Sequence, residues 1–219
     1  RLEMVLQRLV DTGLKLKPSK CKLLQRKVIF LGHVITGDGV ATDPSKTEEI
    51  NRWPVPRSTK DVRSFLGLCG YYRRFINQYA EIAFPMTSLL KKGVKFRWSE
   101  TCQEAFEKLK AALTSPPILA MPRDEGTFFL DTDASDHSVG AVLSQMQDGQ
   151  ERVIAYAAKV LQPAQVKYCA YRRELLATII FVRHFRNYLL GHHWILRTDN
   201  AALSWLRKHR DPVGQNARW

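Results

Sequence analysis

The chain has few cysteines, no long apolar run and no signal sequence. Its four cysteines lie far apart, with no C-x-x-C pair and no histidine at zinc-finger spacing. We therefore expect reduced thiols in an intracellular protein, and neither a disulfide framework nor a zinc module. No apolar stretch approaches the roughly 20 residues that span a bilayer, so no membrane contact is expected. The opening Arg1-Leu2-Glu3 is neither an initiator nor a signal sequence, and we expect a piece of a longer protein.

Acidic residues are also fewer than basic ones. The chain has 34 Lys and Arg but only 21 Asp and Glu, which gives a formal net charge of +13. The excess is spread over both halves of the chain. A distributed positive field suits a polyanion, and the release of counterions from phosphates would make such binding strongly salt-dependent. Nucleic acid is the expected partner. A protein whose basic surface has no such role fits the same composition, and charge alone does not decide between the two.

Apolar periodicity predicts small β elements and then helices in the first part of the chain. Residues 1–43 are expected to hold a helix over 2–10, an alternating strand over 14–17 and a β-hairpin over 27–42. Residues 44–122 follow helical spacing and predict a small bundle. The expected N-caps, whose side-chain oxygens accept hydrogen bonds from the first turn of a helix, are Asp43, Ser58 and Ser99.

Strand patterns return after residue 122 and predict a mixed sheet. The expected elements are strands over 127–133, 139–145 and 152–158, a helix over 168–190, a strand over 193–199 and a basic helix over 201–210. Three strands, a helix, a strand and a helix begin an α/β domain with a mixed sheet. The predicted fold class is therefore α+β or α/β and multidomain, with a helical bundle followed by a mixed β-sheet domain.

Three carboxylates interrupt or end apolar segments of the second half: Asp133, Glu174 and Asp199. Desolvating an ionised carboxylate is costly unless a cation compensates its charge. Asp133 and Asp199 are expected at strand ends facing open space, and Glu174 at the margin of a buried helix face. Two divalent cations about 3.5–4 Å apart carry phosphodiester hydrolysis, and hard carboxylate oxygens suit magnesium. The pattern predicts such a site if the three side chains converge.

Each carboxylate has a structural explanation as well. Asp133 and Asp199 fit turn or N-cap aspartates, and Glu174 fits an ion pair with a nearby arginine. The candidate arginine partners of Glu174 are Arg172, Arg173 and Arg197. For each residue taken singly, the structural explanation is as good as the metal site. The order and context of the three residues together favour the metal site.

The segments 132–135, 140–145, 173–177 and 197–200, in this order, resemble the ribonuclease H domain of gypsy-like long-terminal-repeat retrotransposon polyproteins. Upstream, the segments 30–35 and 63–76 resemble the end of the palm and the thumb of the same reverse transcriptases. The resemblance covers nearly the whole chain. It implies a helical thumb followed by an incomplete ribonuclease H-like domain.

The resemblance also implies roles for single residues. Asp133, Glu174 and Asp199 match the first three metal-binding carboxylates, which would hold two Mg²⁺ ions, with Mn²⁺ as the alternative ion, whereas Asp131 matches no catalytic position. The residues that match nucleic-acid contacts, in the hairpin that holds the primer terminus and in the thumb, are Phe30, Leu31, Gly32, His33, Arg73 and Arg74. The thumb core is expected from Phe65, Leu68, Tyr72 and Ile76.

The implied domains are the palm end with its hairpin over 1–43, a thumb or connection over 44–122, and a C-terminally truncated ribonuclease H domain over 123–219. The palm's Tyr-x-Asp-Asp element is expected before residue 1, so this chain alone should not polymerise. A fourth aspartate is expected after residue 219, and without it we expect weak metal binding or slow turnover.

The implied partners are an RNA–DNA hybrid, a template–primer duplex and the rest of the Pol polyprotein, in a cytoplasmic virus-like particle or the nucleus. The implied function is that of the C-terminal part of a reverse transcriptase, whose ribonuclease H domain would cut the RNA strand of RNA–DNA hybrids with two magnesium ions. The alternative function is a catalytically inactive nucleic-acid-binding remnant. A weaker third hypothesis is a structural or protein-interaction piece whose basic surface is incidental.

Overall fold

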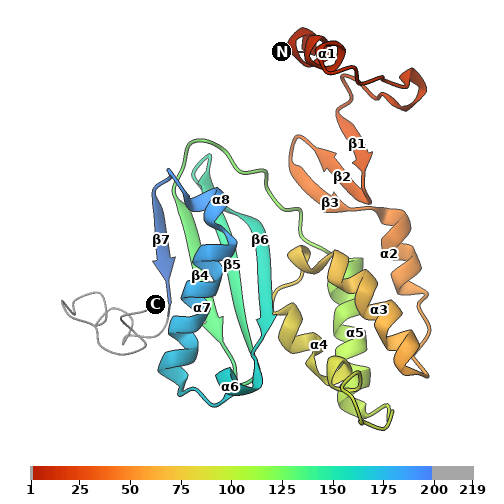
Figure 1. Ribbon diagram of the computed structural model, residues 1–219, viewed down its shortest axis with the longest axis vertical. Helices are drawn as coiled ribbons and strands as arrows, with labels where there is room; N and C mark the ends of the chain where they lie inside the picture. Colours follow the sequence, from red (N-terminus) through yellow and green to blue (C-terminus); the bar gives the residue numbers. More distant parts are fainter. Residues whose placement is uncertain (1, 199–219) are drawn as a thin grey trace, which may run out of the picture.

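The computed structural model describes residues 2–198, which form a small sheet, a helical bundle and a larger sheet with its own helices, in that order (Figure 1). This order confirms the predicted fold class. In the described part of the chain, no helix is both long enough and apolar enough to cross a membrane.

The first part of the chain forms a helix, a short 3-10 turn and a three-stranded antiparallel sheet. Its elements are α1 (Leu2–Asp11), η1 (Pro18–Lys20), β1 (Lys27–Phe30), β2 (His33–Thr36) and β3 (Gly39–Thr42). The apolar run after residue 27 is broken by a tight turn at Leu31 and Gly32, both of which have positive φ, 48° and 71°. The predicted hairpin is therefore a meander with two turns.

The strand predicted over 14–17 is wrong. These residues are exposed and irregular, and no strand in the described chain pairs with them. Strand alternation stabilises a β conformation only when a neighbouring strand satisfies the backbone amides and carbonyls. The following Pro18 begins η1 instead.

The helical bundle follows the predicted caps. Its elements are α2 (Pro44–Asn51), α3 (Thr59–Tyr71), η2 (Arg73–Phe75), α4 (Tyr79–Ser88) and α5 (Glu100–Thr114). The side chain of Asp43 accepts a hydrogen bond from the Ser45 amide at 3.0 Å, and that of Ser58 accepts one from the Asp61 amide at 3.2 Å. Ser99 caps α5 through the Cys102 amide. These three N-cap predictions are confirmed.

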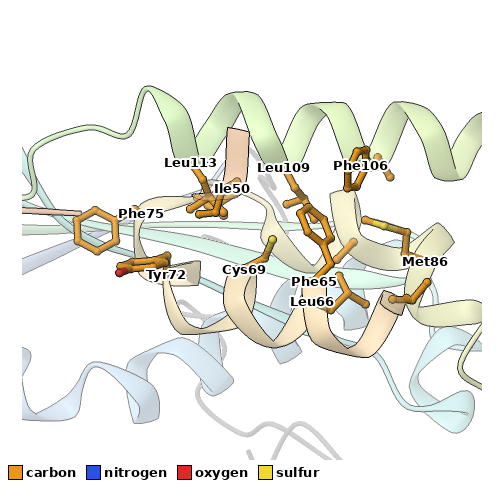
Figure 2. Packing of buried hydrophobic residues seen from close by; sticks show 14 of the residues in the cluster. Ile50, Phe65, Leu66, Cys69, Tyr72, Phe75, Met86, Phe106, Leu109 and Leu113 are labelled. Carbon is orange, nitrogen blue, oxygen red and sulfur yellow. The ribbon is translucent and has the colours of Figure 1, made fainter. Parts of the chain in front are cut away.

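The bundle core is built from the apolar faces of α3, α4 and α5 (Figure 2). Phe65 and Phe106 are fully buried, with ring centroids 4.7 Å apart. Burying side chains of this kind stabilises the fold by roughly 1.5–3 kcal/mol each. Of the predicted thumb-core residues, Phe65, Tyr72 and Ile76 are buried, and Leu68 packs against the same core.

The second sheet has the order β6-β5-β4-β7, in which β4 and β7 are parallel and the other pairs antiparallel. Its strands are β4 (Phe128–Ala134), β5 (Ser138–Gln147), β6 (Gln150–Val160) and β7 (Trp194–Arg197). The crossover from β6 to β7 contains α6 (Pro163–Val166), α7 (Ala170–His184) and α8 (Arg186–Leu189). The single long helix predicted over 168–190 is thus interrupted at Phe185.

Both faces of this sheet are in contact with helices. The hydroxyl of Thr132 in β4 lies 3.4 Å from the hydroxyl of Thr178 in α7, so α7 packs on the face that carries Thr132. Asp133 and its cross-strand partner Gly140 alternate to the opposite face, where both approach Gln78, next to α4. The bundle therefore packs on the face of the sheet that α7 leaves open.

A backbone link joins the small sheet to the linker after α5. Val40 and Leu119 exchange two hydrogen bonds, at 2.8 and 2.9 Å, and the Ala120 amide donates to Val153 of β6 at 2.8 Å. Gly39 adjoins this link with φ +141°, and a Cβ added there would overlap the carbonyl oxygen of Leu119. Only glycine fits this position without a backbone shift.

We therefore expect Gly39→Ala to lower the free energy of unfolding by about 2 kcal/mol or more, because the new methyl group separates Val40 from Leu119. Urea denaturation followed by circular dichroism measures this change. Gly37→Ala is the matched control, since Gly37 has open space around its Cβ position. Equal stability of the two variants would show that the link does not constrain Gly39.

Candidate functional site

Asp133 lies next to the end of β4 and is exposed. It lines an open hollow of about 290 Å³ together with Asp131, Thr132, Arg197 and Thr198. The predicted exposure of Asp133 at a strand end is confirmed. The hollow leaves room for a ligand at this carboxylate.

Glu174 belongs to α7 and is buried, with 8% of its surface exposed. Its Oε1 atom accepts a hydrogen bond from the backbone amide of Ala134 at 3.2 Å. Because Ala134 directly follows Asp133, the buried carboxylate of α7 reaches the strand end that carries the exposed one. Two of the three predicted carboxylates are thereby brought to the same end of β4, Asp133 from the open face and Glu174 from the helix side.

The third carboxylate, Asp199, lies outside the described residues, as does the basic helix predicted over 201–210. Within residues 2–198, no group of three or more His, Cys, Asp or Glu side chains is placed to hold a metal ion. The described pair accounts for only two of the three predicted ligands. The convergence of all three carboxylates stays a prediction.

A bundle residue contacts Asp133. Gln78, at the start of α4, donates a hydrogen bond from Nε2 to Asp133 Oδ2 at 3.3 Å, across 55 positions of sequence. Gln78 has a left-handed backbone, φ 53° and ψ 31°, which is uncommon for a residue other than glycine. Nothing in the sequence around Gln78 indicated this contact, because it depends on how the bundle packs on the sheet.

Arginines neutralise other carboxylates near the site. Arg197 donates to both oxygens of Asp131, each at 2.6 Å, and to both oxygens of Glu151, at 2.6 and 2.9 Å. Arg173 pairs with Asp136 at 2.6 Å and also donates to the Ser135 carbonyl. Hydrogen bonds from Arg197 and Ser144 hold the pKa of Glu151 below its usual value. Arg197 of β7 thus links Asp131 of β4 to Glu151 of β6, and Asp131 has a structural role.

The predicted primer hairpin packs against the end of α3. The Tyr71 hydroxyl donates to the Leu31 carbonyl, and the Tyr72 hydroxyl donates to the Gly32 carbonyl at 2.9 Å. The His33 ring stacks on Tyr71 with centroids 5.4 Å apart. Phe30 and Leu31 remain 60% and 69% exposed. The backbone of the turn is thus held by the end of α3, while the Phe30 and Leu31 side chains stay exposed.

Of the two predicted thumb arginines, Arg74 lies near this hairpin. Arg73 is exposed and Arg74 is half-buried, with its guanidinium 5.8 Å from the centre of the Phe75 ring. The pKa of His33 is lowered, first by burial and then by the positive charge of Arg74. The structure therefore brings His33 and Arg74, predicted as parts of separate motifs, into one basic and aromatic surface.

The chain is similar to known proteins along its whole length. Residues 98–196 match the model of the RNase H-like domain found in reverse transcriptase. The Retrovirus-related Pol polyprotein from transposon 297 of Drosophila melanogaster is 42% identical over 219 residues, which cover 100% of this chain and 20% of that protein. The Transposon Tf2-3 polyprotein of Schizosaccharomyces pombe is 36% identical over 186 residues, 84% of this chain and 14% of that protein. The chain thus spans one fifth or less of these relatives.

Solved structures share the fold. A foamy viral protease-reverse transcriptase in complex with RNA/DNA hybrid has a TM-score of 0.78 at 23% identity, covering 99% of this chain and 30% of that chain. A foamy viral protease-reverse transcriptase dRH in complex with ds DNA has the same score at 24% identity, covering 98% and 39%. At these identities the likeness concerns the fold, and it agrees with the predicted helical bundle followed by a ribonuclease H-like sheet.

The ion pair of Arg197 with Glu151, whose pKa is lowered, predicts a pH-dependent contribution to stability. A carboxylate whose folded-state pKa is lowered stabilises the fold above its unfolded pKa, and this stability is lost as the pH falls through the lower folded value. We expect Arg197→Gln to cost about 1 kcal/mol at pH 7, because both pairs are partly exposed and screened. The difference from the unmodified chain should shrink as the pH falls below 4.5, the ordinary value for Glu151.

Thermal unfolding at a series of pH values measures this effect. Arg172→Gln serves as the control, because Arg172 is an exposed arginine of α7. A loss for Arg197→Gln that stays constant from pH 7 to pH 3 would contradict the assignment.

Proposed function

Because the chain is homologous to retrotransposon Pol polyproteins and carries an RNase H-like domain of the reverse transcriptase kind, we propose that it cuts the RNA strand of RNA–DNA hybrids. The reaction class is phosphodiester hydrolysis assisted by two Mg²⁺ ions. In the longer polyprotein, the part before the RNase H-like domain would support RNA-directed DNA polymerisation.

The observation that carries the proposal is that Asp133 and Glu174 both reach one end of β4, Asp133 by its place in the strand and Glu174 by its hydrogen bond to the Ala134 amide. Asp133 presents free carboxylate surface to an open hollow, and Glu174 is oriented by the Ala134 amide. This donor set fits magnesium, a hard cation that prefers carboxylate oxygens. Bound there, magnesium would supply charge stabilisation and lower the pKa of an attacking water. The protein's own contribution is to hold the two carboxylates in place from a strand and a helix that pack together.

Asp199 is the proposed third ligand. It follows Arg197 by two positions, as Asp133 follows Asp131 by two, and Arg197 stands opposite Asp131 in the parallel pair of β4 and β7. This matched spacing supports the assignment. The nearby Asp131 is bound on both oxygens by Arg197, which leaves Asp133 as the better ligand on this strand.

The proposed nucleic-acid contacts lie on the bundle side. Phe30 and Leu31 would approach the primer end from the hairpin tip, and Arg73 and Arg74 would contact phosphates. The foamy viral reverse transcriptases that share the fold are in complex with RNA/DNA hybrid and ds DNA, which supports a duplex or hybrid as the partner. Contacts to backbone and 2′-hydroxyl groups would give little sequence preference.

We expect Asp133→Asn to reduce magnesium-dependent cleavage of a labelled RNA–DNA hybrid by about 100-fold or more. Asparagine has nearly the same shape as aspartate but lacks the negative charge that would bind the metal. The measurement uses the 219-residue chain and a longer polypeptide that continues past Trp219, each with Mg²⁺ and with EDTA. Asp124→Asn, in the exposed linker before β4, is the matched control.

Full activity of Asp133→Asn would show that the site is assigned to the wrong residues. Hybrid binding without cleavage by either polypeptide would favour the inactive remnant instead. Cleavage by the 219-residue chain that EDTA abolishes would exclude that alternative.

A further inference from the structure

A second cavity lies where the helical bundle meets edge strand β6. It has a volume of about 660 Å³ and is bordered by η2 on one side, by residues 155–159 of β6, and by α7 and α8 on the other side. Figure 1 shows the bundle beside β6, and α7 and α8 in front of the sheet. The volume is in the range of small-molecule sites, roughly 300–1,000 Å³. Neither Asp133 nor Glu174 lines it.

Several basic side chains of the described residues line this cavity. Arg73 and Arg74 come from η2, Lys159 from β6 and His184 from the end of α7, and among residues 2–198 no Asp or Glu lines the cavity. Two domains therefore contribute positive charge to one cavity. Because like charges placed together repel, such an arrangement is stabilised by a bound anion.

The local contacts show that this charge is not neutralised from within. Among the ion pairs of the described residues, none involves Arg73, Arg74 or Lys159. The Nε atom of Arg74 is buried and has no hydrogen-bond partner in the described structure. The pKa of His184 is lowered, first by burial and then by Arg73. The positive charge of Arg73 in η2 therefore acts on His184 of α7, on the other side of the cavity. A buried donor without a partner is costly unless a ligand satisfies it.

Half of the remaining described lining residues are aromatic. Tyr71, Tyr156 and Tyr188 are exposed or half-buried beside the basic residues. The Tyr71 hydroxyl is already bonded to the Leu31 carbonyl and its ring stacks on His33, so Tyr71 contributes only the exposed part of its ring. Nucleic-acid bases stack on such rings, and arginines bind phosphates through paired N–H groups. Basic and aromatic side chains in one cavity match the two chemical parts of a nucleotide.

We propose that this cavity between η2, β6 and α7 binds one nucleotide unit, with its phosphate on Arg73, Arg74 and Lys159 and its base against the tyrosine rings. The nucleotide comes either from a single strand of bound nucleic acid or from free nucleotide, since both carry the same phosphate and base. The site deepens the nucleic-acid binding of the proposed function and needs no metal.

Binding measured in EDTA separates this site from the nuclease centre. The first arm measures fluorescence anisotropy of a labelled oligothymidylate at several salt concentrations, and the second measures thymidine monophosphate by calorimetry. We expect Arg74→Gln and Lys159→Gln each to weaken oligothymidylate binding about 10-fold and to lower the salt slope by about 1, because each removes one phosphate contact. Arg97→Gln, at an exposed arginine of the bundle outside the cavity, should change affinity less than about 2-fold.

Every outcome decides the proposal. Weaker oligothymidylate binding by the cavity variants supports a strand as the source, and loss of monophosphate binding in the same variants supports free nucleotide. Cavity variants that match Arg97→Gln in both arms overturn the site, even if hybrid cleavage still requires Asp133. Arg74 is half-buried, so a loss of stability would complicate Arg74→Gln. Lys159 is exposed, so we expect Lys159→Gln to leave the fold intact. Thermal unfolding of Lys159→Gln checks this.

Discussion

Backbone hydrogen bonds at two neighbouring residues hold the three parts of this chain together. Leu119 pairs with Val40 of the small sheet, and Ala120 donates to Val153 of the large one. The linker after α5 is thereby attached on both sides, and the bundle is placed against β5 and β6. The stacking of Phe84 of α4 on His137, with ring centroids 4.5 Å apart, extends the same contact. Both the approach of Gln78 to Asp133 and the basic cavity beside β6 depend on this placement.

The carboxylates of the large sheet divide into two groups by their partners. Asp131 and Glu151 are neutralised by Arg197, and Asp136 by Arg173. Asp133 receives a hydrogen bond from the neutral amide of Gln78 and stays open to solvent. In a chain with a net charge of +13, arginines thus satisfy the structural carboxylates and leave Asp133 accessible to an added cation. This division separates the proposed metal ligand from its neighbours in the same strand.

Local sequence signals predicted the local structure well. The N-caps at Asp43, Ser58 and Ser99 were found because a capping hydrogen bond forms within three residues. Strand alternation predicted β4, β5 and β6 to within a few residues. The same alternation was misleading over 14–17, where no strand pairs with the segment, and helical spacing did not indicate the interruption at Phe185. Whether a segment with strand or helix periodicity adopts that structure depends on which elements pack against it. The segment's own residues do not specify those elements.

The sequence by itself determined the order of the helical and sheet domains and the kinship with retrotransposon polyproteins, and it predicted Asp133, Glu174 and Asp199 as candidate site residues. These conclusions rest on short patterns, whose physical causes act over a few neighbouring positions. Only the tertiary structure decided which arginine pairs with which carboxylate, that Gln78 touches Asp133, and that Arg74 and Lys159 line one cavity. Those contacts join residues far apart in sequence, and they exist because the bundle packs on one face and edge of the sheet while α7 covers the other face.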